Sequence, residues 1–202
     1  MSLTGGGGAR TLLRYLAAAL VLWLPAIAAG ADATAALESR LAACLACHGE
    51  KGQSSIPEVP SLGGQPEFYL TVQLLLFRDR LRVVDLMNQM MQGFSNDDLR
   101  TMAKLISKLP PPPPAAGAAD TERLEKAQAL AVQNRCNFCH NRDYGGEKNV
   151  PRLAGQREDY LIKALREYKS NARRGYDAAM ADVLYSLTDQ DLLDLAHFLA
   201  RR

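Results

Sequence analysis

Apolar residues recur along this chain at the spacing of an α-helix, and no alternating pattern typical of a β-strand reaches a useful length. One segment of the second half places side chains at positions i, i+1, i+4, i+5 and i+8 of one helix face: Tyr160, Leu161, Ala164, Leu165 and Tyr168. Its counterpart in the first half starts at Pro66, a residue suited to a first helical turn, and continues through Tyr69, Leu70, Leu74 and Phe77. The pattern predicts an all-α protein with about six helices.

Further helices are predicted from composition and from the residues at their starts. Two segments rich in Ala, Leu and Glu should be helical, 34–46 and 121–135, and Asp120 or Thr121 is suited to cap the second. The last helix of each half should begin at a Ser/Thr-x-x-acid box, in which hydroxyl and carboxylate satisfy the free N–H groups of the first turn. The two boxes are "SNDD" (95–98) and "TDQD" (188–191).

The two halves of the chain repeat each other. "VPSLGGQPEFYL" (59–70) matches "VPRLAGQREDYL" (150–161), and "FSNDDL" (94–99) matches "LTDQDL" (187–192) in the same order. Two long copies indicate duplication of a whole domain rather than a solenoid. "PPPPPAAGAA" (110–119) lies between the copies and favours an extended, semi-rigid spacer. We therefore predict a first lobe at 32–109, a proline-rich linker at 110–119 and a second lobe at 120–202.

Residues 1–31 have the pattern of a signal peptide. Arg10 and Arg14 precede the apolar run 15–29, and Ala29-Gly30-Ala31 fits the small-x-small cleavage rule, so we expect a cut before Asp32. The run is short for a membrane span, which needs about 20 apolar residues, and an uncleaved anchor is the alternative. Cleavage would place the mature protein in the periplasm, an oxidising compartment.

Composition and charge exclude some classes of function. The 202 residues are 48% hydrophobic and 23% charged, as expected for a folded protein. Removing the leader takes away two of 24 basic residues and no acid, so 22 basic residues face 22 acidic ones and the mature net charge is zero. A basic patch with interleaved aromatic residues is absent from the sequence, which excludes nucleic acid as the expected partner. Lobes this small often need a cofactor to complete their core.

All four cysteines lie in two copies of the motif C-x-x-C-H, "CLACH" (44–48) and "CNFCH" (136–140). The motif is typical of covalent haem attachment, in which both thiols form thioethers with the haem vinyl groups. One helical turn then presents the two sulfur atoms to the porphyrin edge and the histidine to its iron. The sequence predicts two covalently bound haem c groups, held by Cys44 and Cys47 with His48 and by Cys136 and Cys139 with His140.

Two other chemistries of paired cysteines fit less well. A zinc site needs four ligands, but each lobe offers two cysteines and one adjacent histidine. A thioredoxin-like dithiol requires a strand followed by a helix, whereas the pattern here is helical.

A second axial ligand for each iron is expected from methionine, a common partner of histidine in electron carriers. Met180, which lies eight residues before Thr188, is the one methionine of the second lobe. Eight residues before the equivalent Ser95 lies Met87. We predict Met87 and Met180 as iron ligands.

The remaining methionines and the third histidine are assigned to other roles. Met90, Met91 and Met102 align with apolar residues of the second lobe, so we expect them to pack in the core. His197 aligns with Lys104 and is interpreted as a partly exposed surface histidine.

Several residues that recur in both lobes are candidates for contacts around the haem. A backbone carbonyl in the loops at Pro60 and Pro151 is suited to accept the second ring N–H of each axial histidine. Haem propionates need donors, and the recurring candidates are Gln65, Tyr69 and Arg82 with Gln156, Tyr160 and Arg173.

The order of these motifs resembles the dihaem cytochrome c4 family. In the first lobe, C-x-x-C-H is followed by "P-x-L-x-GQ-x-x-x-YL", by "R-x(4)-M-x(7)-S" over 82–95 and by a capped last helix, and the second lobe keeps this order. The resemblance covers residues 35–200. It implies two class I cytochrome c domains, each with an iron bound by histidine and methionine.

The resemblance also implies a function. A periplasmic one-electron carrier, soluble or loosely associated with the membrane, would pass electrons from a respiratory donor to a terminal oxidase or reductase, and it would not be an enzyme. The first alternative is the haem-bearing subunit of a periplasmic dehydrogenase, similar to the cytochrome subunit of flavocytochrome c sulfide dehydrogenase. The second is an enzyme or gas sensor with one five-coordinate haem.

Overall fold

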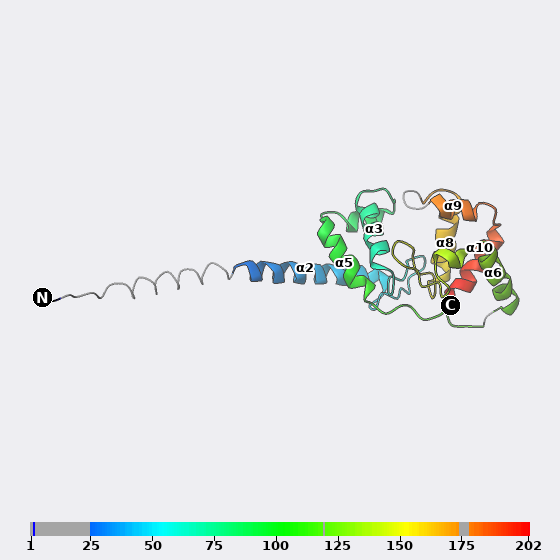
Figure 1. Cartoon of the computed structure of the whole chain (residues 1–202), viewed down its shortest axis with the longest axis horizontal. Helices are drawn as coiled ribbons and strands as arrows, with labels where there is room; N and C mark the ends of the chain where they lie inside the picture. Colours follow the sequence, from blue (N-terminus) through cyan, green and yellow to red (C-terminus); the bar gives the residue numbers. More distant parts are fainter. Residues whose placement is uncertain (1, 3–24, 119, 174–177) are drawn as a thin grey trace. The chain divides into compact units, whose positions relative to one another are not determined.

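The predicted all-α fold class is confirmed. The computed structural model describes residue 2 and residues 25–118, 120–173 and 178–202, and within these ranges it contains helices and a single isolated β-bridge between Glu147 and Val150 (Figure 1). The helices are α2 (Pro25–His48), α3 (Glu67–Arg78), α4 (Asp85–Met90), α5 (Asn96–Ser107), α6 (Thr121–Gln133), α7 (Cys136–Cys139), α8 (Glu158–Lys169), α9 (Ala178–Leu184) and α10 (Asp189–Ala200). The short helices α4 and α9 were not predicted, whereas α7 is the helical turn expected at the second C-x-x-C-H motif.

The chain divides into two compact units, residues 1–40 and 41–202. The second unit contains both C-x-x-C-H motifs, the linker and all helices from α3 to α10. Most of the predicted leader lies outside the described residues, while Ala29-Gly30-Ala31 falls within α2, so the cleavage before Asp32 stays a prediction. Among the described helices, none is long and apolar enough to cross a membrane.

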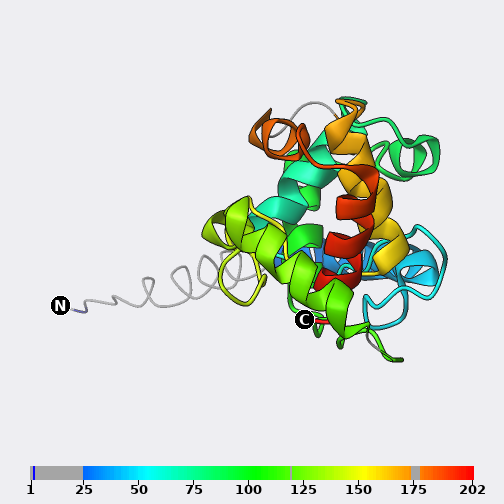
Figure 2. The same ribbon diagram turned by 90° about the vertical axis from the view of Figure 1, so that its right-hand side faces the viewer.

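Each lobe is built around its last helix. In the first lobe α5 packs against α3, and its inward residues Leu99, Met102, Ala103 and Ile106 are buried. In the second lobe α10 packs against both α6 and α8, and Figure 2 shows α10 (red) alongside α8 (orange-yellow). Small side chains of α6, Ala127 and Ala131, are fully buried, which allows α10 to approach closely.

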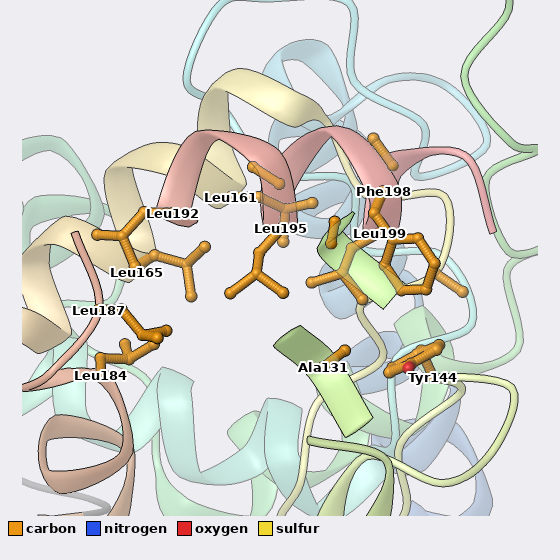
Figure 3. Close-up of a cluster of buried hydrophobic side chains, with 14 residues drawn as sticks. Ala131, Tyr144, Leu161, Leu165, Leu184, Leu187, Leu192, Leu195, Phe198 and Leu199 are labelled. Carbon is orange, nitrogen blue, oxygen red and sulfur yellow. The ribbon is translucent and has the colours of Figure 1, made fainter. Parts of the chain in front are cut away.

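The core of the second lobe draws leucines from several elements. Figure 3 shows Leu165 from α8 and Leu195 from α10 in one cluster with Leu184, the last residue of α9, and Leu187, from the loop after α9. Tyr144 closes one end, with its ring edge against the ring of Phe198 at a centroid distance of 5.6 Å. The loop that follows the second C-x-x-C-H motif therefore contributes directly to the core.

Helix ends follow the predicted caps closely. Ser95 and Thr188 both form complete capping boxes, with Asp98 and Asp191 respectively, and Asp120 caps α6 by accepting from the N–H of Arg123. One boundary differs from the prediction, since 121–135 is not a single helix that leads into the motif. Arg135 has a left-handed backbone with φ of 55°, which separates α6 from the short helix α7.

The linker is not an isolated spacer, because its prolines pack against loops of both lobes. We call residues 110–113 the proline strap. Gln53 donates from Nε2 to the carbonyl oxygen of Pro111 at 3.0 Å, and on the other side a Cβ placed on Gly155 would lie 2.5 Å from the carbonyl oxygen of Pro112. Past the strap, the N–H of Ala115 donates to the carbonyl of Ala200 at 2.7 Å. The strap therefore contacts both lobes within the second unit.

Candidate functional site

The first C-x-x-C-H motif occupies the last turn of α2. His48 is buried, and its Nδ1 atom lies 2.8 Å from the carbonyl oxygen of Pro60. Because a carbonyl can only accept, Nδ1 carries the proton and Nε2 is the nitrogen that remains to bind a metal. Burial lowers the pKa of His48 and outweighs the bond to Pro60, which acts in the opposite direction. The lowered pKa keeps the ring neutral near pH 7. Gly49, with φ of 86°, ends the helix directly after this histidine.

The second motif repeats this geometry on α7. The N–H of His140 donates to the carbonyl of Cys136 at 3.0 Å, so the two cysteines and the histidine share one helical turn. His140 is buried, and its Nδ1 atom lies 2.9 Å from the carbonyl oxygen of Pro151. Both proline loops thus orient an imidazole with Nε2 directed away from the loop.

The donor sets of both motifs fit a covalent haem. None of the cysteines Cys44, Cys47, Cys136 and Cys139 is joined in a disulfide, as thioether formation requires. Within the described ranges, no group of three or more His, Cys, Asp and Glu side chains could hold a metal ion. Each motif therefore offers two thiols for attachment and one oriented imidazole for an iron.

The predicted methionine ligands lie on the two short helices that were not predicted. Met180 on α9 is half-buried and packs against the core of the second lobe, which Cys136 also contacts. Met87 on α4 is half-buried as well. Met91 and Met102 are almost completely buried, in agreement with the packing role expected for them, while Met90 is half-buried. Ligation by Met87 and Met180 stays a prediction.

Gln65 and Gln156 reach across to the other lobe. Gln156 donates from Nε2 to the carbonyl of Ser61 at 2.8 Å, and its Oε1 accepts the N–H of Ser61 at 2.8 Å. Gln65 makes the same pair of bonds with Arg152, at 2.8 Å to its carbonyl and 3.0 Å from its N–H. These bonds do not support the predicted role of the two amides as propionate donors, because both the Nε2 and the Oε1 of each amide already bond to the backbone of the other lobe.

The other four recurring candidates form one cluster, which draws on both lobes. Arg173 donates to the hydroxyls of Tyr160 and Tyr69, both at 3.3 Å, and Arg82 donates to the same Tyr160 hydroxyl at 3.3 Å. Gln73, which no sequence pattern above singled out, also belongs to the cluster, because its Oε1 accepts from Arg82 at 2.6 Å. Its position one helical turn after Tyr69 could have indicated it.

The charges of this cluster change the acidity of its phenols. Burial would raise the pKa of Tyr160, but the guanidinium groups of Arg173 and Arg82 outweigh it and lower that pKa to about 8. Burial raises the pKa of Tyr69 to about 12, although Arg173 acts in the opposite direction. Among the described residues, no carboxylate forms an ion pair with Arg82 or Arg173. The cluster is therefore a positively charged site suited to an anion.

His197 differs from the prediction of a partly exposed surface residue. It is 6% exposed, and its Nδ1 atom lies 3.3 Å from both carboxylate oxygens of Glu158, which also accepts from Arg201 at 2.8 Å. The prediction was wrong because α10 is covered by α6 on one side and by α8 on the other. The alignment of His197 with Lys104 gave no sign of this second covering helix.

Comparison with known proteins agrees with the site. The cytochrome c family model matches residues 124–201. Cytochrome c4 of Azotobacter vinelandii is 29% identical over 89% of this chain and 94% of its own length. The thiosulfate dehydrogenase electron acceptor of Thiomonas intermedia is 32% identical over 82% of this chain and 81% of its own. The crystal structure of reduced cytochrome c4 from Pseudomonas stutzeri, 27% identical, covers 82% of this chain and 96% of its own with a TM-score of 0.73.

Fold, motif geometry and relatives together define a c-type cytochrome with two class I domains, a carrier of electrons through covalently bound haem c. Within that class, the chain belongs to the cytochrome c4 family.

Proposed function

We propose that this chain carries two haem c groups, one in each lobe, and passes single electrons between redox proteins in the periplasm. The observation that carries the proposal is the repeated arrangement of two cysteines outside any disulfide and a histidine whose Nδ1 is held by a proline carbonyl. The bound haem would supply a reversible one-electron change at its iron.

The chain's own residues would attach and orient each haem. Cys44 and Cys47 in the first lobe, and Cys136 and Cys139 in the second, would form the thioethers. His48 and His140 would bind the irons through Nε2, and Met87 and Met180 would each supply a second ligand through sulfur. A thioether ligand favours a relatively high reduction potential, which suits a donor to an oxidase.

The anion site between the lobes supports the placement of two haems. Arg82 and Arg173, with the hydroxyls of Tyr69 and Tyr160, provide donors from both lobes at one place. Haem propionates are carboxylates, and two guanidinium groups would neutralise them there. Propionates from the haem of either lobe would therefore find donors from both lobes at this one site.

The role of electron carrier implies brief contacts with partners. The predicted leader supports export to the periplasm, where an electron-donor complex and a terminal oxidase or reductase would be the partners, with loose association to the membrane. Redox partners typically bind through small interfaces of less than about 1,200 Å². We do not propose an enzymatic reaction for this chain.

A second function is favoured by one relative. The protein of Thiomonas intermedia is described as an electron acceptor of thiosulfate dehydrogenase, so a periplasmic dehydrogenase is a candidate donor here as well. In this alternative the chain would be the haem-bearing electron-transfer subunit of the dehydrogenase. Purification from the native host distinguishes the two functions. A subunit would stay with its dehydrogenase through size-exclusion chromatography, whereas a mobile carrier would elute alone.

The central test is a count of haems and ligands on the exported protein. Mass spectrometry should give a chain that starts at Asp32 and carries two haem masses, and the oxidised protein should show the weak charge-transfer band of methionine bound to iron. A colourless protein with four free thiols, or one with bound zinc, would overturn the proposal.

A further inference from the structure

The peptide bond that follows each histidine-binding proline is hydrogen-bonded at both ends. The carbonyl oxygen of Pro60 accepts from Nδ1 of His48, and the N–H of the same peptide group, on Ser61, donates to Oε1 of Gln156. These two bonds are both 2.8 Å long. They form one continuous chain from a side chain of the second lobe to the axial histidine of the first.

The other lobe has the mirror arrangement. The carbonyl of Pro151 accepts from Nδ1 of His140 at 2.9 Å, and the N–H of Arg152 donates to Oε1 of Gln65 at 3.0 Å. Each glutamine is buried, with exposed fractions of 6% for Gln65 and 4% for Gln156. Each glutamine also donates from its Nε2 to the carbonyl of the residue whose N–H its Oε1 accepts, so the Oε1 has little freedom to turn away.

Hydrogen bonds at the two ends of one peptide group strengthen each other. An acceptor at the N–H pushes electron density toward the carbonyl oxygen, which then accepts more strongly, by about 10–30% per bond. A stronger acceptor at Nδ1 makes the imidazole a more basic ligand through Nε2. A more basic ligand stabilises the oxidised iron relative to the reduced iron and so lowers the reduction potential.

We infer that Gln65 and Gln156 are positioning residues that tune the haem of the opposite lobe. Gln156 lowers the reduction potential of the iron bound by His48, and Gln65 lowers that of the iron bound by His140. The inference rests on the proposed function, since it requires these histidines to be the axial ligands. If the glutamines only held the lobes together, they would not tune a particular haem. The inference instead predicts that each glutamine changes the reduction potential of the haem in the opposite lobe.

The test uses three variants of the complete holoprotein with the same substitution. Gln156→Met and Gln65→Met keep the length of the side chain and add no charge, but they remove the amide. Gln53→Met is the matched control, because it removes a glutamine whose side-chain amide donates to the carbonyl groups of Pro110 and Pro111 in the proline strap instead of bonding to Ser61 or Arg152. The potential of each haem is measured separately by a redox titration followed through resolved haem methyl signals in NMR spectra.

The expected result is a crossed pattern. Gln156→Met shifts the potential of the first-lobe haem to more positive values, Gln65→Met does the same for the second-lobe haem, and Gln53→Met leaves both nearly unchanged. In the reduced protein, the Nδ1–H resonance of His48 moves upfield in Gln156→Met and that of His140 moves upfield in Gln65→Met, as each hydrogen bond weakens. The milder variants Gln156→Asn and Gln65→Asn, which shorten the reach of the amide, give smaller shifts in the same direction and serve if a methionine variant does not fold.

Three outcomes overturn the inference. These are no change in either potential, a change confined to the lobe that carries the substitution, and an equal change of both haems in all three variants. The last would show only a loosened contact between the lobes. Failure of the proposed function is recognised separately, because the unmodified protein would then lack two haems with histidine ligands before any variant is made.

Discussion

The side chain of Arg123 on α6 donates from Nε to the carboxylate of Asp194 on α10 at 2.9 Å. Asp194 is 2% exposed and also accepts from Lys126 at 3.0 Å and from Gln190 at 2.8 Å. Burial alone would raise the pKa of Asp194, but the hydrogen bonds from these three side chains lower it below the ordinary value of 3.8. A charged residue thus joins the first and last helices of the second lobe.

Replacing Asp194 should lower the free energy of unfolding in a manner that depends on pH. Asp194→Ala leaves two cationic side chains without their buried partner, which costs about 1–3 kcal/mol at pH 7. Because the pKa of this carboxyl is lower in the folded protein than in the unfolded chain, its contribution is present above the unfolded pKa and is lost as pH falls through the folded pKa. The wild-type protein and the variant should therefore converge in stability as pH falls below about 4.

Urea unfolding at several pH values checks this. Asp97→Ala is a suitable control, since Asp97 forms an exposed ion pair with Arg100 on α5 and should change stability by no more than about 0.5 kcal/mol. An Asp194→Ala variant that loses as much stability at pH 2 as at pH 7 would contradict the assigned role.

The contact of the proline strap with the second lobe predicts a steric effect at Gly155. This glycine has φ of 72°, and an added Cβ would lie 2.5 Å from the carbonyl oxygen of Pro112. Gly93 has a similar φ of 76° with no atom within 4 Å of the same position. Gly93→Ala therefore measures the cost of the left-handed backbone alone, of about 1 kcal/mol, and Gly155→Ala should cost at least about 1 kcal/mol more. Equal losses in thermal unfolding would show that the strap can move aside freely.

Local patterns in the sequence predicted most of the helices because each depends on neighbouring residues. The apolar face of Tyr160, Leu161 and Leu165 and the acid boxes at Ser95 and Thr188 act within one or two turns, and α8, α5 and α10 follow from them. The loops that place Pro60 and Pro151 beside the histidines were predicted from the chemistry of axial ligands rather than from any helical pattern.

The contacts between the lobes could not be predicted in the same way. Gln65 and Gln156 were picked out by their repetition as candidate propionate donors, but repetition does not indicate which lobe a side chain will contact, and both bond to the backbone of the other lobe. His197 was wrongly expected at the surface because burial by α8 depends on packing between segments far apart in sequence. A left-handed backbone is usually expected at glycine or asparagine, but the residue in this conformation is Arg135. The break between α6 and α7 could therefore not be predicted.

The capping box of α10 predicts a modest loss of stability from one hydroxyl. The hydroxyl of Thr188 accepts the N–H of Asp191 at 3.2 Å, and the Asp191 carboxylate accepts the N–H of Thr188 at 2.9 Å. Thr188→Ala should lower the free energy of unfolding by about 1 kcal/mol, whereas Thr188→Ser, which keeps the hydroxyl, should cost much less. The hydrogen bond from the Thr188 hydroxyl is the largest cause that lowers the pKa of Asp191. The pKa of Asp191 should therefore rise in Thr188→Ala and not in Thr188→Ser.

The predicted sulfur ligands give the sharpest test of the two sites. Met180→Ala should lower the reduction potential of the second-lobe haem by on the order of 0.1 V, a fraction of the roughly 0.8 V range that axial ligands span. The reduced variant should also bind carbon monoxide at neutral pH, since an exchangeable position would replace the thioether. Met87→Ala should do the same in the first lobe.

Helix α4 offers a matched control for the first of these lobes. Met90 lies three residues after Met87 on the same helix and is also half-buried, so Met90→Ala removes a neighbouring thioether without the predicted ligand. Met90→Ala should leave the methionine charge-transfer band intact and should not allow carbon monoxide to bind. If Met90→Ala opens the haem and Met87→Ala does not, the ligand is Met90, and the equal spacing of Met87 and Met180 from their capping boxes is a coincidence.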